Sequence, residues 1–173
     1  YEVACIYLNY VDDCEISRCK FYQVHDSEGQ QNWVIEGHSL SRFLCEDNYF
    51  DTCDQCVYLS VCDYAKVQDN RFESIYSRIF NLNNSTNCHF RENIGNNLNT
   101  ARYLESAIYC GTNYADLLVE SNNLHNVNGM CLWSEDGDRM TVSNNTFEAG
   151  AEPDQCIAVG SVTKSVFSGN RFI

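Results

Sequence analysis

The stretch Val67-Gln-Asp-Asn70-Arg-Phe72-Glu-Ser-Ile75 contains a pattern that returns along the whole chain. An apolar residue is followed three places later by asparagine, and two places after that by a large apolar residue. Successive copies lie 22 to 29 residues apart, and a repeat of this length is typical of solenoids, in which each repeat forms one coil. The copies, of which the first and fourth are weaker, centre on Cys19, Asn48, Asn70, Asn93, Asn122, Asn145 and Asn170.

Two further segments of each repeat alternate as a strand with one buried face does. Positions thirteen and eleven places before the asparagine are mostly apolar, and so are positions five and three places before it. A spacing of two residues is the period of a β-strand. We therefore predict three short strands per repeat, wound into coils that stack about 4.8 Å apart.

The recurring asparagine has a physical role in such a stack. We expect it to take a left-handed backbone conformation, which asparagine tolerates, and so to bend the chain. Its side-chain amide can donate to the asparagine carbonyl of the next coil. The repeat therefore predicts an asparagine ladder that joins the coils.

In these repeats the chain resembles the right-handed parallel β-helix superfamily, the pectate-lyase-like fold of polysaccharide lyases, glycoside hydrolases and phage tailspikes. The resemblance covers residues 1–173 and is greatest to a tailspike-type β-helix. It implies an all-β fold, a right-handed single-stranded parallel β-helix of about seven coils of 22–29 residues. Because neither end carries a cap, we expect one β-helix domain that is a fragment of a longer chain.

The composition excludes some partners. Of the 173 residues, 24 are Asp or Glu and 11 are Lys or Arg, which gives a formal net charge of −13. Nucleic-acid binding needs a basic face, so we expect no nucleic-acid partner. The sequence also shows no signal peptide and no membrane span.

The eleven cysteines do not have metal-site spacing. Cys53 and Cys56 form a CxxC pair, but no second pair or histidine completes a site, and the four histidines share no metal spacing. We predict no metal and no cofactor. Because several cysteines occupy repeat columns, we expect free thiols packed near the core, as in a protein folded in a reducing cytosol. A virion appendage or another extracellular protein with that folding history fits this expectation.

The outward positions of the first strand carry the candidate binding residues. Insertions fall in the connection after the third strand, with long loops at 24–32 and 97–106 beside this face, and in solenoids the face with insertions is often the binding face. Aromatic rings suit the C–H faces of sugars, and fixed amides and carboxylates suit hydroxyl groups. The superfamily resemblance implies a glycan at the same place. The alternative is an ordinary strand surface, where Tyr and Trp are common. The candidate glycan-binding residues are Tyr58, Trp133, Glu36, His38, Asn81, Asn83 and Glu135.

A second outward column is apolar. We expect it to be covered either by the variable loops or by another subunit, and the tailspike resemblance implies a homotrimer. This column, fourteen places before the asparagine, contains Cys5, Val34, Cys56, Ile79, Ile108, Cys131 and Cys156.

The catalytic residues stay unknown. A glycosidase needs two carboxylates roughly 5–10 Å apart, whereas Glu36 and Glu135 lie four coils apart, about 19 Å. Near this face the basic residues that a lyase would need are Arg78 and Arg102. Any enzymatic activity would degrade polysaccharide, as a glycoside hydrolase or lyase.

Three functions stay open. The first is a glycan-recognising rod of a tailspike-like or cell-surface polysaccharide-binding protein, either alone or as part of a depolymerase. Its partner is a polysaccharide or oligosaccharide. The second is a purely structural rod that serves assembly and has no ligand. The third is a secreted polysaccharide lyase or epimerase.

Overall fold

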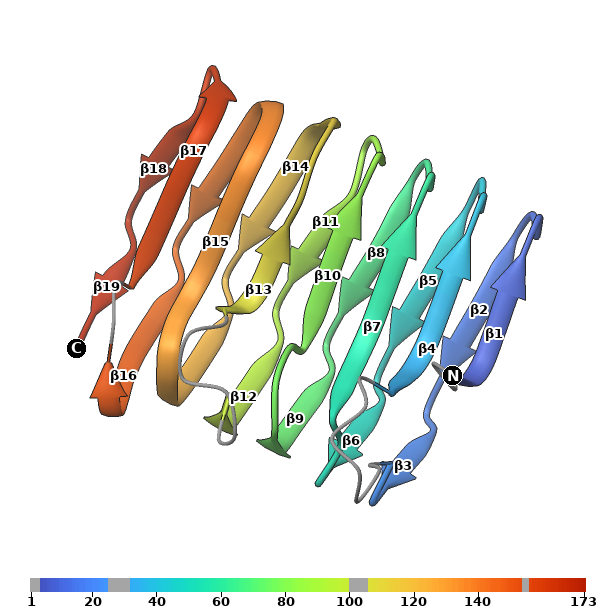
Figure 1. Ribbon diagram of the computed structural model, residues 1–173, viewed down its shortest axis with the longest axis horizontal. Coiled ribbons are helices and arrows are strands. Elements are labelled where there is room, and N and C mark those ends of the chain that lie inside the picture. Colours follow the sequence, from blue (N-terminus) through green and yellow to red (C-terminus); the bar gives the residue numbers. More distant parts are fainter. Residues whose placement is uncertain (1–3, 25–31, 100–105, 154–155) are drawn as a thin grey trace.

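The computed structural model describes residues 4–24, 32–99, 106–153 and 156–173. Within these ranges the regular secondary structure consists of β-strands, and every strand pairing is parallel. The strands wind into coils stacked along one axis, with the first coil at one end of a rod and the last coil at the other (Figure 1). The prediction of an all-β parallel β-helix is confirmed.

The strands form three sheets that run along the rod. The first sheet contains β1 (Ala4–Asn9), β4 (Trp33–His38), β7 (Gln55–Ser60), β10 (Phe80–Asn83), β13 (Ser106–Cys110), part of β15 (Asn123–Ser143) and β17 (Ile157–Thr163). The second contains β2 (Cys14–Ser17), β5 (Phe43–Glu46), β8 (Ala65–Gln68), β11 (His89–Arg91), β14 (Tyr114–Glu120), the end of β15 and β18 (Val166–Ser168). The third contains β3 (Lys20–Tyr22), β6 (Tyr49–Asp51), β9 (Arg71–Ile75), β12 (Ile94–Leu98), the start of β15, β16 (Thr146–Pro153) and β19 (Arg171–Phe172).

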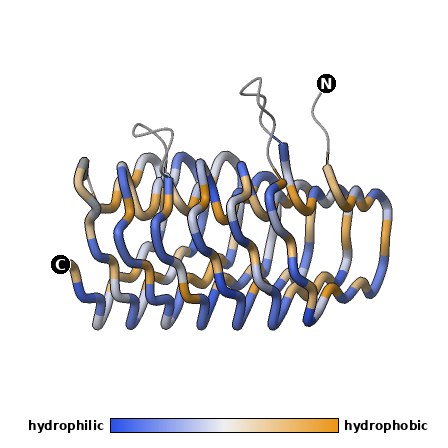
Figure 2. Tube along the Cα trace, turned by 90° about the horizontal axis from the view of Figure 1, so that it is seen from below, coloured by the Kyte–Doolittle hydropathy of each residue, from blue (hydrophilic) through white to orange (hydrophobic). Residues whose placement is uncertain are grey.

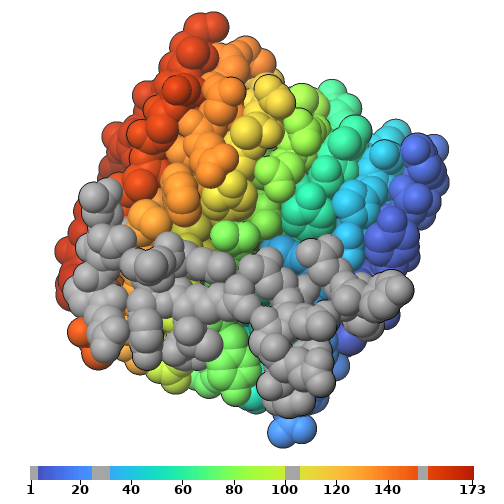
Figure 3. Space-filling view, in the orientation of Figure 1, coloured from blue at the N-terminus to red at the C-terminus, as the bar shows by residue number. Residues whose placement is uncertain are grey.

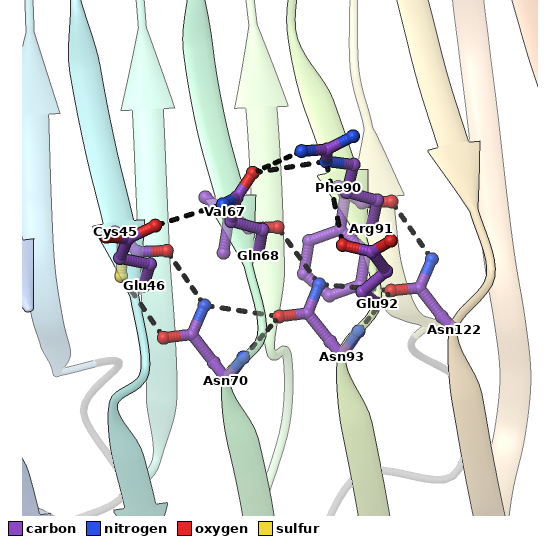
Figure 4. A network of polar contacts seen from close by, with 10 residues as sticks. All are labelled: Cys45, Glu46, Val67, Gln68, Asn70, Phe90, Arg91, Glu92, Asn93 and Asn122. Carbon is purple, nitrogen blue, oxygen red and sulfur yellow. Dashed lines mark hydrogen bonds and ion pairs between the residues drawn. The ribbon is translucent and has the colours of Figure 1, made fainter. Parts of the chain in front are cut away.

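The asparagines between the second and third sheets are hydrogen-bonded to one another. Asn48 Nδ2 donates to Asn70 Oδ1 at 3.0 Å. Asn70 Nδ2 donates to Asn93 Oδ1 at 3.1 Å, a bond that Figure 4 shows. The same bonds continue through Asn122, Asn145 and Asn170. In the first coil, where cysteine stands in this column, only the backbone N–H of Cys19 joins the row, by donating to Asn48 Oδ1 at 2.9 Å.

The bend in the chain is made by the residue before the asparagine, so the prediction that the asparagine itself is left-handed was wrong. The asparagine keeps an ordinary backbone conformation, and its preceding residue has a positive φ. This residue also donates its backbone N–H to the next coil, as Glu92 does to Glu120 O at 3.0 Å. The left-handed residues are Arg18, Asp47, Asp69, Glu92, Ser121, Asn144 and Gly169.

Apolar residues recur at matching places of successive coils (Figure 2). The rings of Phe50 and Phe72 stack with their centroids 5.0 Å apart, and Phe90 continues the stack 6.3 Å from Phe72. Gly95 occupies the phenylalanine position of the fourth repeat because Leu98 and Leu124 fill that space. A Cβ on Gly95 would come within 2.7 Å of Leu98 Cδ1 and 3.0 Å of a Leu124 methyl carbon.

The first strand of the fifth repeat is shifted by one residue relative to the prediction. Ile108 pairs with Phe80 and Leu132, and Tyr109 pairs with Asn81 and Trp133. The turn after β13 is one residue longer than its counterparts, so counting back from Asn122 misplaces this strand. Tyr109, thirteen places before Asn122, is predicted by the repeat to lie in the core, but it points outward. Cys110, twelve places before Asn122, is predicted to point outward, but it is fully buried.

Most members of the outward apolar column, for which we expected a cover by the variable loops or by another subunit, are buried in the single chain, whereas Cys5 is exposed and Cys156 is partly exposed. Val34, Cys56 and Ile79 are 0% exposed and Cys131 is 1% exposed. Burial of this column therefore gives no argument for a trimer, which stays a prediction. Most of the two predicted long loops, residues 25–31 and 100–105, lies outside the described residues. Arg102 belongs to the second of these ranges.

All eleven cysteines are free thiols, as predicted, and most are buried. Burial raises the pKa of the Cys88 thiol to about 12 and that of Cys53 to about 11. These thiols are therefore protonated at neutral pH and pack as small apolar groups. Among the described residues there is no helix long and apolar enough to span a membrane.

Replacing Asn70 by alanine should lower the free energy of unfolding by about 1–3 kcal/mol, because buried partners on both neighbouring coils lose their bonds. Urea unfolding measures this loss. Asn123→Ala, at an exposed strand position, is the matched control and should change stability by less than about 0.5 kcal/mol. Equal effects of the two substitutions would contradict the role of the ladder.

Replacing Phe72 by alanine should cost about 3–5 kcal/mol, because the removed ring leaves a cavity between Phe50 and Phe90 that stacked sheets cannot close. Tyr22→Ala on the exposed side of the third sheet should cost under about 0.5 kcal/mol. Thermal and urea unfolding of both variants measure the difference, and a small loss at Phe72 would mean that this column is not the core.

Candidate functional site

The outward side chains of the first sheet form two rows along the rod, on the face shown in Figure 3. We call them the aromatic row and the polar row. All seven predicted binding residues lie in one or the other. The aromatic row contains Tyr7, Glu36, Tyr58, Asn81, Tyr109, Trp133 and Ala158. The polar row contains Asn9, His38, Ser60, Asn83, Gly111, Glu135 and Gly160.

The N-terminal part of this face is a cluster around His38. His38 Nε2 lies 2.7 Å from Glu36 Oε1, and the His38 ring meets the ring of Tyr58 edge-on with centroids 5.4 Å apart. Tyr7 lies on the other side of His38 at 5.7 Å, and Trp33 supports Tyr58 at 5.2 Å. The sheet therefore holds a carboxylate and an imidazole between aromatic rings whose orientations are fixed.

The C-terminal part is a second cluster around Tyr109. Its ring is nearly perpendicular to that of Trp133, with centroids 5.7 Å apart, and the Arg78 guanidinium lies 4.5 Å from the Tyr109 ring centroid. Burial, together with a hydrogen bond to the Glu135 carboxylate, raises the pKa of Tyr109 to about 12. The phenol is therefore neutral at pH 7, and Glu135 is held against it.

Two asparagines lie between the clusters. Asn83 Nδ2 donates to Asn81 Oδ1 at 3.1 Å, and Asn81 is only 5% exposed. Asn81 therefore mainly supports Asn83, whereas we had expected both amides to reach a ligand. The side chain of Asn83 occupies space that is free only because residue 111 is glycine, since a Cβ there would lie 1.8 Å from Asn83 Oδ1.

The register sets the spacing of the site. Tyr58 and Trp133 are three pairing steps apart, about 14 Å, and Glu36 and Glu135 are four steps apart, about 19 Å. The two glutamates are too far apart to act as a glycosidase pair. The described residues contain no group of three or more His, Cys, Asp or Glu that could hold a metal ion.

Tyr109 and Arg78 are the residues of the face that the sequence analysis did not assign to it. Tyr109 was hidden by the one-residue shift of its strand. The alternation of apolar and polar residues within this strand could have placed Tyr109 correctly. It makes Ile108 and Cys110 the inward residues, so that Tyr109 between them points outward. The sequence analysis named Arg78 only as a basic residue near the face. No sequence pattern predicts that its guanidinium lies over the Tyr109 ring.

The titration of Tyr109 tests the C-terminal cluster. Because its folded pKa lies above the ordinary value of 10.0, the stability that this phenol contributes is present below pH 10 and is lost as the pH rises through about 12. We would titrate the wild type and Tyr109→Phe with base and subtract their phenolate absorbances. The difference, which reports Tyr109 alone, should show a transition near pH 12. Glu135→Gln should lower this pKa, whereas Glu120→Gln on the second sheet should not. If the absorbance difference instead changes at the ordinary tyrosine pKa of 10.0, Tyr109 is not held in this cluster.

Comparisons with known proteins agree with this fold. Residues 2–147 match the family model described as a right-handed β-helix region. A solved structure described as a glycoside hydrolase is similar at a TM-score of 0.53 and 10% identity, over 96% of this chain and 38% of the hydrolase chain. This chain thus spans less than half of that hydrolase, and the likeness shows the fold alone. No curated protein matches the chain. Because the family model covers most of its length, the chain belongs to the right-handed β-helix family.

Proposed function

We propose that the outer face of the first sheet binds a polysaccharide chain that runs along the rod axis. The observation that supports this proposal is the aromatic row, in which Tyr58, Tyr109 and Trp133 stand in one register line beside polar side chains. Aromatic rings contact the apolar faces of sugars, and the amide and carboxylate groups between them accept and donate hydrogen bonds to hydroxyls.

The contacts within the face favour binding because they limit side-chain freedom before a ligand arrives. Glu36 is held by His38 and Glu135 is held by Tyr109, so these carboxylates lose little rotamer entropy when they accept a sugar hydroxyl. The distance from Tyr58 to Trp133, about 14 Å, is about the span of three sugar residues.

The similarity to a structure described as a glycoside hydrolase supports a carbohydrate-related role for this chain. Glu36 and Glu135 are too distant from each other to cleave a glycosidic bond together. We therefore propose recognition as the role of this face, in a tailspike-like or cell-surface polysaccharide-binding protein. Any depolymerase activity would use other carboxylates.

Substitution of the aromatic anchors tests the proposal. Trp133→Ala and Tyr58→Ala should each weaken glycan binding by about 1–3 kcal/mol, as loss of an aromatic anchor does. The melting temperature should stay nearly unchanged because both side chains lie on the outer face of the sheet. A glycan array would first identify a ligand, and isothermal titration calorimetry would then measure its affinity for each variant.

Tyr22→Ala, an exposed tyrosine on the third sheet, is the matched control and should bind as the wild type does. If Trp133→Ala and Tyr58→Ala instead break an oligomer and leave glycan binding intact, the face serves assembly and the proposal is wrong.

A further inference from the structure

A groove of about 550 Å³ lies on the outer side of the second sheet, across β2, β5 and β8 and up to β11. It shares no residue with the two rows of the first sheet. Its volume is in the range of small-ligand sites, about 300–1,000 Å³. A protein–protein interface needs about 800 Å² on each partner, so a groove confined to a few neighbouring strands suits a small ligand better. The side chains that define its chemistry are Glu15, Leu44, Tyr64, Lys66, Gln68 and Arg91.

The floor of the groove is apolar and one edge is aromatic. Leu44 pairs in register with Glu15 on one side and with Lys66 on the other, so it separates two charged side chains. Tyr64 is 59% exposed. Its φ of 58° bends the chain immediately before β8, beside this floor. Among the described residues no other ring packs on Tyr64, so its face is free to contact a ligand.

Two cationic side chains, Lys66 and Arg91, lie at the far side of the groove, and Arg91 Nε lies 4.0 Å from Glu92 Oε2. Arg91 is held in place by Gln68, whose Oε1 accepts bonds from Nε and Nη2 at 3.1 and 2.9 Å, and Gln68 in turn donates to Glu46 (Figure 4). Lys66 is exposed, and within the described part of the chain its ammonium group has no hydrogen bond or ion pair. Burial, and then Lys66 and Arg91, lower the pKa of His89, which pairs in register with Lys66.

Negative charge lies at the near side. Glu15 is two pairing steps from Lys66, about 9.6 Å, and accepts a hydrogen bond from Ser17 at 2.7 Å. The neighbouring Arg42 and Asp13 pair with each other and so cancel their charges. The groove therefore has an acceptor end at Glu15 and a cationic end at Lys66, with an apolar floor between them, while the charge of Arg91 is partly offset by Glu92.

We infer that this groove is a second binding site, for a short acidic oligosaccharide whose rings carry carboxylates. A ring that lies over Leu44 and against Tyr64 places a carboxylate beside Lys66 and Arg91 and a hydroxyl beside Glu15. The net charge of −13 repels a long polyanion. A short ligand is attracted because only charges within a Debye length, about 8 Å at physiological salt, act strongly on it.

The test uses trisaccharides of galacturonic, glucuronic and mannuronic acid, each beside its neutral counterpart, with the whole chain as the protein. At least one acidic trisaccharide should bind at least about tenfold more tightly than its neutral counterpart. Lys66→Ala should remove about tenfold of that affinity, and the remaining affinity should depend less on salt. Lys20→Ala, an exposed lysine on the third sheet, is the matched control and should not change it.

Four outcomes would overturn the inference. If no acidic trisaccharide binds, or if Lys66→Ala and Arg91→Gln leave binding intact, the groove is not a site for acidic sugars. If a triglutamate peptide binds as tightly as the best trisaccharide, the groove is a general anion site. If affinity falls in Trp133→Ala but not in Lys66→Ala, the trisaccharide occupies the first sheet. Each of these outcomes removes the second site without contradicting the proposed function, and the last one also places the trisaccharide on the first sheet.

Discussion

The buried side-chain amide of the recurring asparagine is the constraint on which the stack depends. Asn70 makes all four of its hydrogen bonds: Nδ2 donates to Cys45 O and to Asn93 Oδ1, and Oδ1 accepts from the backbone N–H and from Nδ2 of Asn48. A buried amide that lost one partner would destabilise the fold by about 1–3 kcal/mol. Each coil can therefore satisfy its asparagine only in one register with its neighbours, and this register also aligns the side chains of the sheets in rows.

The same stacking allows backbone conformations that isolated residues avoid. Val61 and Thr52 are β-branched and have φ of 57° and 56°, where a left-handed conformation costs about 1–2 kcal/mol per residue. Each donates its backbone N–H to the next coil, Val61 to Asn83 O at 3.1 Å and Thr52 to Glu73 O at 3.0 Å. Contacts between coils thus offset unfavourable local conformations, so stability comes from stacking more than from local propensity.

The sequence predicted the strands, the core columns and the face that carries the candidate residues, because each depends on a spacing that repeats. It failed where one coil departs from the others. The extra residue after Cys110 moved Tyr109 from the core to the outer face, and a count from the next asparagine does not show where such a residue is inserted. For the apolar column of Val34 and Cys56 the sequence left two covers open, the variable loops or another subunit, because alternation predicts which way a side chain points but not what lies over it.

The two candidate sites have the same construction on different sheets. Stacked side chains of similar size about 4.8 Å apart would leave a flat ridge with no room for a sugar ring. In the aromatic row the buried Asn81 separates Tyr58 from Tyr109, and on the second sheet Leu44 separates Glu15 from Lys66. Asn81 is smaller than the rings on either side of it, whereas Leu44 is an uncharged side chain between two charged ones. In a solenoid with so regular a register, a residue that departs from its row in size or charge therefore gives the surface its local chemistry, and we propose that ligands bind where such departures occur.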